Sequence, residues 1–155
     1  MKTLLVPIDF SLRSRQALRY AVELARGREA SIVVLHVLPP PSSLQLHVDA
    51  YLGRPMPRLS EEARLEAETR LGALIGSVET EGVAVDRAVE PGEPAATIVR
   101  MAVELGCDLI VIGTHARIGM KEWVLGSIAH RVITCAPCPV VTLRGDEPHA
   151  PHVPL

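Results

Sequence analysis

Short apolar runs along the chain alternate with longer stretches in which apolar residues recur every three or four positions. A short, uninterrupted apolar run is typical of a strand that is covered on both faces of its sheet. The third run alternates more strongly between apolar and polar residues, so we place its strand at or near a sheet edge. Five strands are expected, at residues 3–8, 31–37, 83–89, 108–112 and 139–143.

The stretches between the runs predict helices that each present one apolar face. Either Ser11 or Ser14 can cap the first helix, which is expected to stop at Gly27. A later helix opens at Ser60 and ends by Gly82. The apolar stripes contain Ala17, Leu18, Ala21, Val22 and Ala25; Ala67, Leu71, Leu74, Ile75 and Val78; Ile98, Met101, Ala102 and Leu105; and Ile128, Val132 and Ile133.

Two segments show no sustained apolar period. Residues 39–58 contain several prolines and are interpreted as a long loop, with a short helical turn around residues 44–52 as the alternative. Residues 145–155 carry three prolines and are expected to form a flexible C-terminal tail. A single domain is therefore expected over residues 1–144.

Strands and helices alternate through the whole chain, which is the pattern of an α/β fold. We predict an open five-stranded parallel sheet with helices on both faces. Ligands of such sheets bind beyond the carboxyl ends of the strands, at the point where the strand order reverses. Two strand ends are equipped for this role, namely residues 7–9 and residues 112–114.

Composition and charge narrow the functional classes. With 155 residues, of which 48% are hydrophobic and 22% charged, the chain is the size of one domain and is not disordered throughout. A formal net charge of −2 offers no electrostatic basis for binding nucleic acid or an anionic membrane. No apolar stretch approaches the roughly 18 residues of a membrane span, and Pro7 and Asp9 come too early for a signal peptide. We therefore expect a cytoplasmic protein without nucleic-acid or membrane partners.

Cysteines and histidines provide few candidates for redox or metal chemistry. Cys135 and Cys138 have thioredoxin-like spacing, but the predicted helix precedes the pair, whereas an active redox pair lies at a helix N-terminus. We interpret them as buried small side chains, with redox or metal chemistry as the alternative. His36 lies inside an apolar strand and is interpreted as a hydrogen-bonded core histidine, with a role as a ligand as the alternative. His149 and His152 either bind a metal ion or simply belong to the flexible tail.

A group of glycines suits a phosphate-containing ligand. Gly126 and Ser127 stand at the start of a predicted helix, where unpaired N–H groups and the positive end of the helix dipole attract anions. Gly113 follows the most apolar strand, and Gly119 lies in the intervening loop. Glycines allow a backbone to approach an anion closely, although plain turn formation is the alternative interpretation.

Four segments taken together form a further pattern. The first strand ends in Val-Pro-Ile-Asp, the second contains Leu-His-Val, a glycine-containing loop runs from Gly113 to Ser127, and Ala-Pro-Cys-Pro-Val leads into the last strand. In this combination they resemble the universal stress protein family over about residues 2–143. The resemblance implies the Rossmann-like, adenine nucleotide alpha hydrolase-like fold of that family.

The loop after the fourth predicted strand resembles the nucleotide motif of the ATP-binding branch of the family, with one exception. That motif is a glycine, two residues, a glycine, nine residues, and then a glycine with Ser or Thr. Gly113, Gly126 and Ser127 match the spacing, whereas Ala116 stands where the second glycine belongs. If the position needs a positive φ, alanine costs on the order of 1 kcal/mol, and if it needs bare backbone against a phosphate, the methyl group also clashes. Either effect weakens binding by roughly tenfold or more, but neither implies that all binding is lost.

The resemblance also implies a role for each candidate site residue. Asp9 contacts the ribose hydroxyls, and the backbone of Val37 contacts adenine. Asp9 has an alternative role in which it caps the next helix or supports a turn. The resemblance places Gly113, Gly126, Ser127 and the Ile128 amide on the phosphates, with Ala116 in the same loop and with Pro7 and Ile112 lining the pocket.

Three residues of the intervening loop have two interpretations each. His115 and Arg117 either reach a phosphate or are simply solvated. Trp123 either packs inside the protein or contacts a partner, and it is not expected to act as a platform for stacking bases.

The leading functional prediction is a universal-stress-type protein that binds ATP, with or without Mg²⁺, or a related adenine nucleotide. Occupancy of the nucleotide site would alter the contacts of this protein with its partners in a stress response. The alternative is a nucleotide-free structural or interaction protein of the same fold, which Ala116 favours. As an enzyme it would at most be a slow ATPase, because the sequence shows neither a G-x-x-x-x-G-K-S/T loop nor an evident metal-binding carboxylate pair near the glycines.

The last predicted strand, from Pro139 to Leu143, is apolar and expected at a sheet edge. Exposed edge strands invite pairing with another chain. The resemblance implies a homodimer in which this strand pairs with its symmetry mate and buries Val141 and Leu143. In the alternative, the proline-rich tail folds back over the edge and the chain is a monomer.

Overall fold

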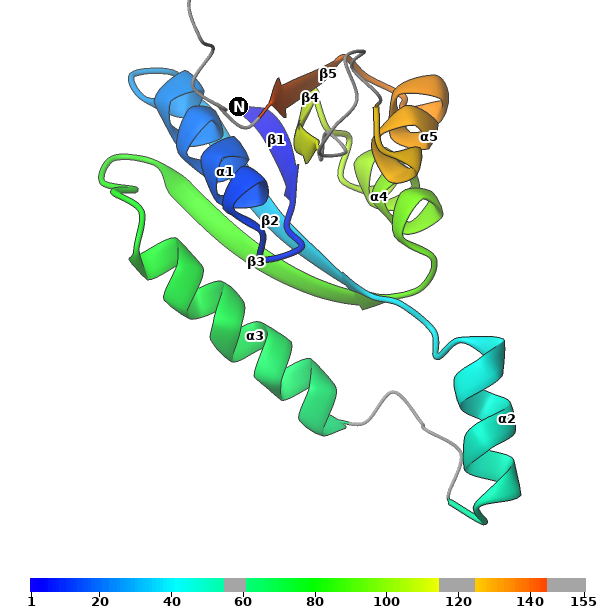
Figure 1. The fold of residues 1–155 in the computed structure, drawn as a ribbon. Coiled ribbons are helices and arrows are strands. Elements are labelled where there is room, and N and C mark those ends of the chain that lie inside the picture. The colour runs from blue at the N-terminus through cyan, green and yellow to red at the C-terminus, as the bar shows by residue number, and fades with distance from the viewer. Residues whose placement is uncertain (55–60, 115–124, 145–155) are drawn as a thin grey trace, which may run out of the picture.

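The computed structural model describes residues 1–54, 61–114 and 125–144. Within these residues, five strands form one sheet in the order β3-β2-β1-β4-β5 (Figure 1). All neighbouring strands pair in parallel, so each connection between strands must cross over the sheet. The strands are β1 (Lys2–Pro7), β2 (Ala30–Leu38), β3 (Ala84–Pro91), β4 (Leu109–Thr114) and β5 (Val140–Arg144).

Helices cover both faces of the sheet. Helices α1 (Leu12–Ala25) and α3 (Glu61–Gly76) lie on one face, and α4 (Pro94–Glu104) and α5 (Ser127–Cys135) lie on the other (Figure 1). Helix α2 (Ser43–Tyr51) follows β2 and lies away from the sheet. The predicted α/β class, with a parallel sheet between two helical layers, is confirmed.

Two apolar layers enclose the central strand β1. Leu4 and Val6 point into the layer beneath α1 and α3, where they join the fully buried Leu18 and Leu71. Leu5 points into the opposite layer, beneath α4 and α5. Because both faces of β1 are buried, its sequence is an uninterrupted apolar run rather than an alternating one.

The segment after β2 differs from the prediction of a long loop over residues 39–58. Helix α2 occupies part of it, and the alternative of a helical turn around residues 44–52 is the correct one. Because α2 lies away from the sheet, it needs no apolar stripe, and a search for apolar periodicity therefore does not reveal it.

Helix α3 ends earlier than predicted, at Gly76 rather than by Gly82. The Ser77 hydroxyl donates a hydrogen bond to the carbonyl oxygen of Leu74 at 2.7 Å, and such side-chain bonds compete with continuation of a helix. Val78 still packs in the core from the turn that follows, which explains why it continued the apolar stripe in the sequence.

In helix α5 the predicted apolar stripe matches the buried face only at Val132. Val132 and Ala129 are buried, whereas Ile128 and Ile133 are 41% and 43% exposed. The helix is short and packs with one side on the layer that it shares with α4. Ile128 instead borders a pocket at the carboxyl ends of the strands.

Candidate functional site

A pocket of about 410 Å³ lies at the carboxyl ends of β1, β2 and β4. The strand order reverses here, because β2 pairs with one side of β1 and β4 pairs with the other. Open parallel sheets bind their ligands at such a point. Both predicted strand ends, residues 7–9 and 112–114, line the pocket, whose volume lies within the range of small-molecule sites.

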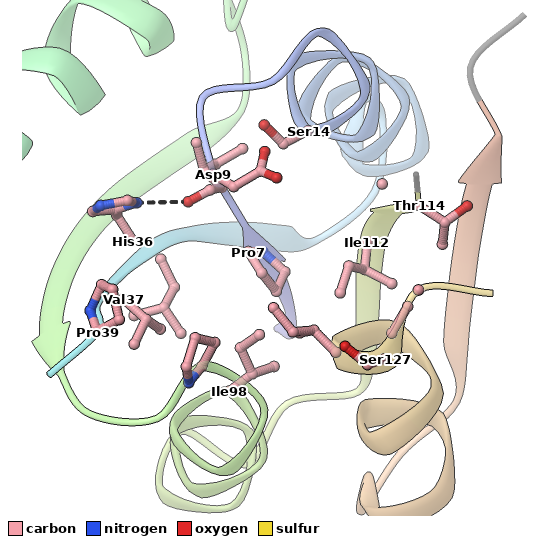
Figure 2. A pocket seen from close by; sticks show the side chains of 17 residues that line it. Pro7, Asp9, Ser14, His36, Val37, Pro39, Ile98, Ile112, Thr114 and Ser127 are labelled. Atoms are coloured by element: carbon pink, nitrogen blue, oxygen red, sulfur yellow. Dashed lines mark hydrogen bonds between the residues drawn. The ribbon is translucent and has the colours of Figure 1, made fainter. Parts of the chain in front are cut away.

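Apolar side chains form most of the pocket wall. In Figure 2, Pro7 and Ile112 lie between two groups of lining side chains. On one side lie three apolar residues, Val37, Pro39 and Ile98. On the other side lie two residues with hydroxyl groups, Thr114 and Ser127. A wall of this kind suits a ligand with one flat apolar part and one polar part.

Asp9 is exposed and lies in the loop between β1 and α1, at the rim of the pocket (Figure 2). Its Oδ1 accepts a hydrogen bond from the backbone N–H of Ser11 at 2.9 Å. Ser11 Oγ in turn accepts from the backbone N–H of Ser14 at 3.2 Å, so Ser11 rather than Ser14 caps α1. The alternative role of Asp9 in supporting a turn is therefore confirmed, and its ribose contact stays a prediction.

His36 is partly buried and hydrogen-bonded, as predicted for a core histidine, but it also borders the pocket. Its Nδ1 lies 2.7 Å from the carbonyl oxygen of Ile8. Because a carbonyl oxygen only accepts hydrogen bonds, the proton must be on Nδ1. This bond ties β2 to the segment that leads from β1 to Asp9.

The N-terminus of α5 lies at the pocket without a side-chain cap. Its N-cap residue, Gly126, provides no side-chain hydrogen bond. By contrast, Ser11 caps α1, and the carboxylate of Glu93 caps α4 by accepting from the N–H groups of Ala95 and Ala96. Of α1, α4 and α5, which all contribute pocket residues, α5 is thus the helix whose first N–H groups are best placed to hold an anion.

Glu93 is a residue beside the pocket that the sequence analysis missed. Its Oε1 lies 2.8 Å from Nη1 of Arg131, which joins α4 to α5. Its hydrogen bond from the Ala96 N–H, assisted by Ala95 and Arg131, lowers the pKa of Glu93, so the cap is charged at neutral pH. The available signal was Pro94, because proline at the first helical position makes the preceding residue the N-cap.

Gly113 permits a close approach between β4 and α1. A Cβ at this position would lie 2.6 Å from the backbone carbon and oxygen of Arg13 and 2.8 Å from the backbone nitrogen of Ser14. No side chain fits at such distances unless the backbone shifts. The structure therefore provides a packing reason for this glycine, beside the phosphate contact and the turn that the sequence suggested.

We expect Gly113→Ala to lower the free energy of unfolding by about 1.5 kcal/mol, because the added methyl group forces α1 away from β4. Urea unfolding of both proteins, followed by circular dichroism, measures this loss. Gly76→Ala is the matched control, since a Cβ at Gly76 meets nothing within 4 Å. A loss for Gly113→Ala no larger than that of the control would contradict the packing role.

The pocket brings together most of the predicted site residues. It is lined by Pro7, Asp9, Val37, Ile112, Gly113, Gly126, Ser127 and Ile128. It also includes Ser14, His36, Pro39, Pro94 and Ile98, which the sequence analysis did not assign to a site. The predicted roles of the following residues stay predictions, because they lie outside the described part of the chain: His115, Ala116, Arg117, Gly119, Trp123, His149 and His152.

The cysteines are free thiols. Cys107 is buried and Cys138 partly so, but Cys135 is exposed, contrary to the prediction, because in the last turn of α5 it is Val132, not Cys135, that faces the core. Burial raises the pKa of Cys107 to about 11 and also raises the pKa of Cys138, which disfavours their reactive thiolate forms.

In residues 1–54, 61–114 and 125–144, no cluster of three His, Cys, Asp or Glu side chains suits a metal ion. Nor does any helix there have the length and apolarity to span a membrane.

Comparison with known proteins agrees with this architecture. The model of the universal stress protein family matches residues 1–144. Universal stress protein YxiE of Bacillus subtilis is 33% identical over 147 residues, which cover 91% of this chain and 97% of the relative. Universal stress protein G of Salmonella typhimurium is 34% identical over 145 residues, which cover 92% and 99%.

A solved structure shows the same similarity in three dimensions. It is the universal stress protein from Archaeoglobus fulgidus in complex with dAMP, which is 29% identical and has a TM-score of 0.65. The match covers 92% of this chain and 97% of the other. On the strength of the family match over nearly its whole length, this chain belongs to the universal stress protein family.

Proposed function

We propose that the pocket binds ATP or a related adenine nucleotide. The observation that carries the proposal is that one apolar pocket is bordered both by the carboxylate of Asp9 and by the uncapped N-terminus of α5. A nucleotide has a partner for each of these features: a flat base, ribose hydroxyls that donate to a carboxylate, and phosphates that accept from helix N–H groups. The residues present therefore fit this class of ligand.

Each part of the nucleotide is assigned to one part of the pocket. The base lies on the apolar side, where the backbone of Val37 provides its polar contacts. The ribose hydroxyls donate to Asp9. The phosphates accept from the first backbone N–H groups of α5, around Gly126, Ser127 and Ile128.

The Archaeoglobus fulgidus relative supports the ligand class, because that protein forms a complex with dAMP. An apolar pocket beside the N-terminus of α5, which has no side-chain cap, also supports binding as the main activity. We propose that the protein acts by binding a nucleotide, preferably a triphosphate, and that occupancy alters its contacts with partner proteins.

Titration calorimetry with ATP, AMP and adenosine, each with and without Mg²⁺, tests this proposal. We expect saturable binding of the phosphorylated ligands at or below millimolar concentration, with adenosine binding more weakly. Mass spectrometry of the purified protein provides an unbiased search for retained nucleotide. If millimolar ATP gives no saturable signal, the proposal is wrong and the nucleotide-free interaction protein becomes the better interpretation.

Ala116→Gly is expected to strengthen ATP binding by roughly tenfold, because glycine removes both the methyl group and the restriction on positive φ at this motif position. Affinity for adenosine should not change, since the motif faces the phosphates. The variant should be slightly less stable because glycine increases the entropy of the unfolded chain. Calorimetry with both ligands measures the effect, and unchanged or weaker ATP binding would show that the loop holds phosphates in another way.

We further propose a cytoplasmic homodimer joined through β5. The two edges of the sheet are β3 and β5, and they differ in character. Strand β3 carries Asp86, Arg87 and Glu90, and charges on an edge strand discourage pairing with another chain. In β5, Val141 and Leu143 are apolar and only partly buried, which favours pairing along this edge.

A further inference from the structure

The loop that carries Asp9 contains an unusual backbone conformation. Phe10 has a φ of 65°, and it is the one non-glycine residue with a left-handed backbone in the described part of the chain. A bulky residue adopts this conformation only where its surroundings hold it there. The neighbours of Phe10 are therefore the groups that determine where Asp9 lies.

The ring of Phe10 contacts two residues that are distant in the sequence. The first is His36 from β2, whose ring is tilted against that of Phe10 with 4.6 Å between the ring centroids. From α3, the guanidinium carbon of Arg70 lies 3.9 Å from the centroid of the Phe10 ring, which is a cation–π contact. These contacts fix the position of a side chain whose backbone is in a strained region.

Hydrogen bonds hold the residues on either side of Phe10. The Ile8 N–H donates to the carbonyl oxygen of Leu35 at 2.8 Å, and the carbonyl oxygen of Ile8 accepts from His36 Nδ1 at 2.7 Å. After Phe10, the N–H of Ser11 donates to Asp9 Oδ1 at 2.9 Å. The backbone around Asp9 is thus tied to β2, while the Arg70 contact ties Phe10 to α3.

We propose that Arg70 is a positioning residue for Asp9 and acts through Phe10. By stacking on Phe10, the exposed guanidinium stabilises the left-handed turn in which the Asp9 carboxylate borders the pocket. The role in ligand binding rests on the proposed function, whereas the effect on the turn does not. Arg70 would therefore influence ribose recognition from the outer side of α3 without touching the nucleotide.

The first test compares Arg70→Gln with Arg64→Gln, using ATP and 2′,3′-dideoxy-ATP in titration calorimetry. Arg64 is the matched control because it lies on the same helix and pairs with Glu68 instead of Phe10. We expect Arg70→Gln to lower the affinity for ATP by about two- to fivefold, which corresponds to the loss of an exposed cation–π contact. The affinity for dideoxy-ATP should not change. Equal loss for both nucleotides, or no loss for ATP, would overturn the proposal.

The second test uses the protein without nucleotide, so that it remains decisive if ATP does not bind and the proposed function fails. The exchange rate of the Ser11 amide, measured by NMR, reports whether its bond to Asp9 is formed. We expect Arg70→Gln to raise this rate by about two- to fivefold, with no change for Arg64→Gln or for the amide of Ala21 within α1. If Arg70→Gln leaves the Ser11 rate unchanged, Arg70 does not position Asp9.

Discussion

Asp9→Ala is expected to weaken the binding of ATP, AMP and adenosine alike by about 2 kcal/mol, which raises each Kd roughly thirtyfold. The variant removes a charged acceptor from the ribose hydroxyls, and all three ligands carry the same ribose. Titration calorimetry with the three ligands measures the loss. Because Asp9 also accepts from the Ser11 N–H, circular dichroism must show that the variant remains folded.

Ser127→Ala is the matched control, because it changes the part of the pocket that is assigned to the phosphates rather than to the ribose. It should weaken ATP and AMP but leave adenosine unchanged, because Ser127 begins the helix that is assigned to the phosphates. Asp9→Asn adds a second control, since its amide oxygen can still accept from Ser11 while the charge is lost. An Asp9→Ala protein that is folded and binds ATP with unchanged affinity would show that ribose recognition lies elsewhere.

Val141→Lys is expected to convert the proposed dimer into a monomer. The substitution would bury two lysines near the twofold axis, and we estimate that it weakens association by about 3 kcal/mol, or at least roughly a hundredfold. Sedimentation equilibrium at micromolar concentration measures the change. The monomer should tolerate the lysine, because Val141 is only partly buried on the edge strand.

Asp86→Lys is the matched control, because it places a lysine on the exposed face of the other edge strand. This variant should sediment like the unmodified chain. The interface is wrong if the unmodified chain is monomeric at micromolar concentration, in which case the tail folded over the edge becomes the better explanation. It is equally wrong if Val141→Lys sediments as a dimer.

The strands were predictable because each one is a local apolar run. Residues 3–8 and 108–112 contain hardly any polar residues, and only a strand that is buried on both faces tolerates this. The α/β pattern indicates that a ligand binds where the strand order reverses, and the residues at two strand ends marked those ends, which line the pocket, as candidates. Helix α2 could not be recognised in the same way, because it lies away from the sheet and leaves Val48 and Tyr51 exposed.

The candidate site was predictable only in part. Asp9, Gly126 and Ser127 stand at the ends of strands and helices, where sequence signals are strong. Pro39, just after β2, and Ile98, in α4, reach the pocket only after the sheet has formed. No local pattern marks such residues, because their role depends on which strands become neighbours.

By itself, the sequence determined the α/β class, the order of the strands and of the helices that pack on the sheet, and the helix start at Gly126 and Ser127. These properties depend on residues that are near one another along the chain, so periodicity and capping rules are enough to read them. Only the tertiary structure decided that α1 packs on Gly113, that Ile128 and Ile133 stay exposed, and that Arg70 and His36 hold Phe10. Each of these depends on contacts between distant segments, and such contacts are decided by how helices and strands pack together rather than by any local preference.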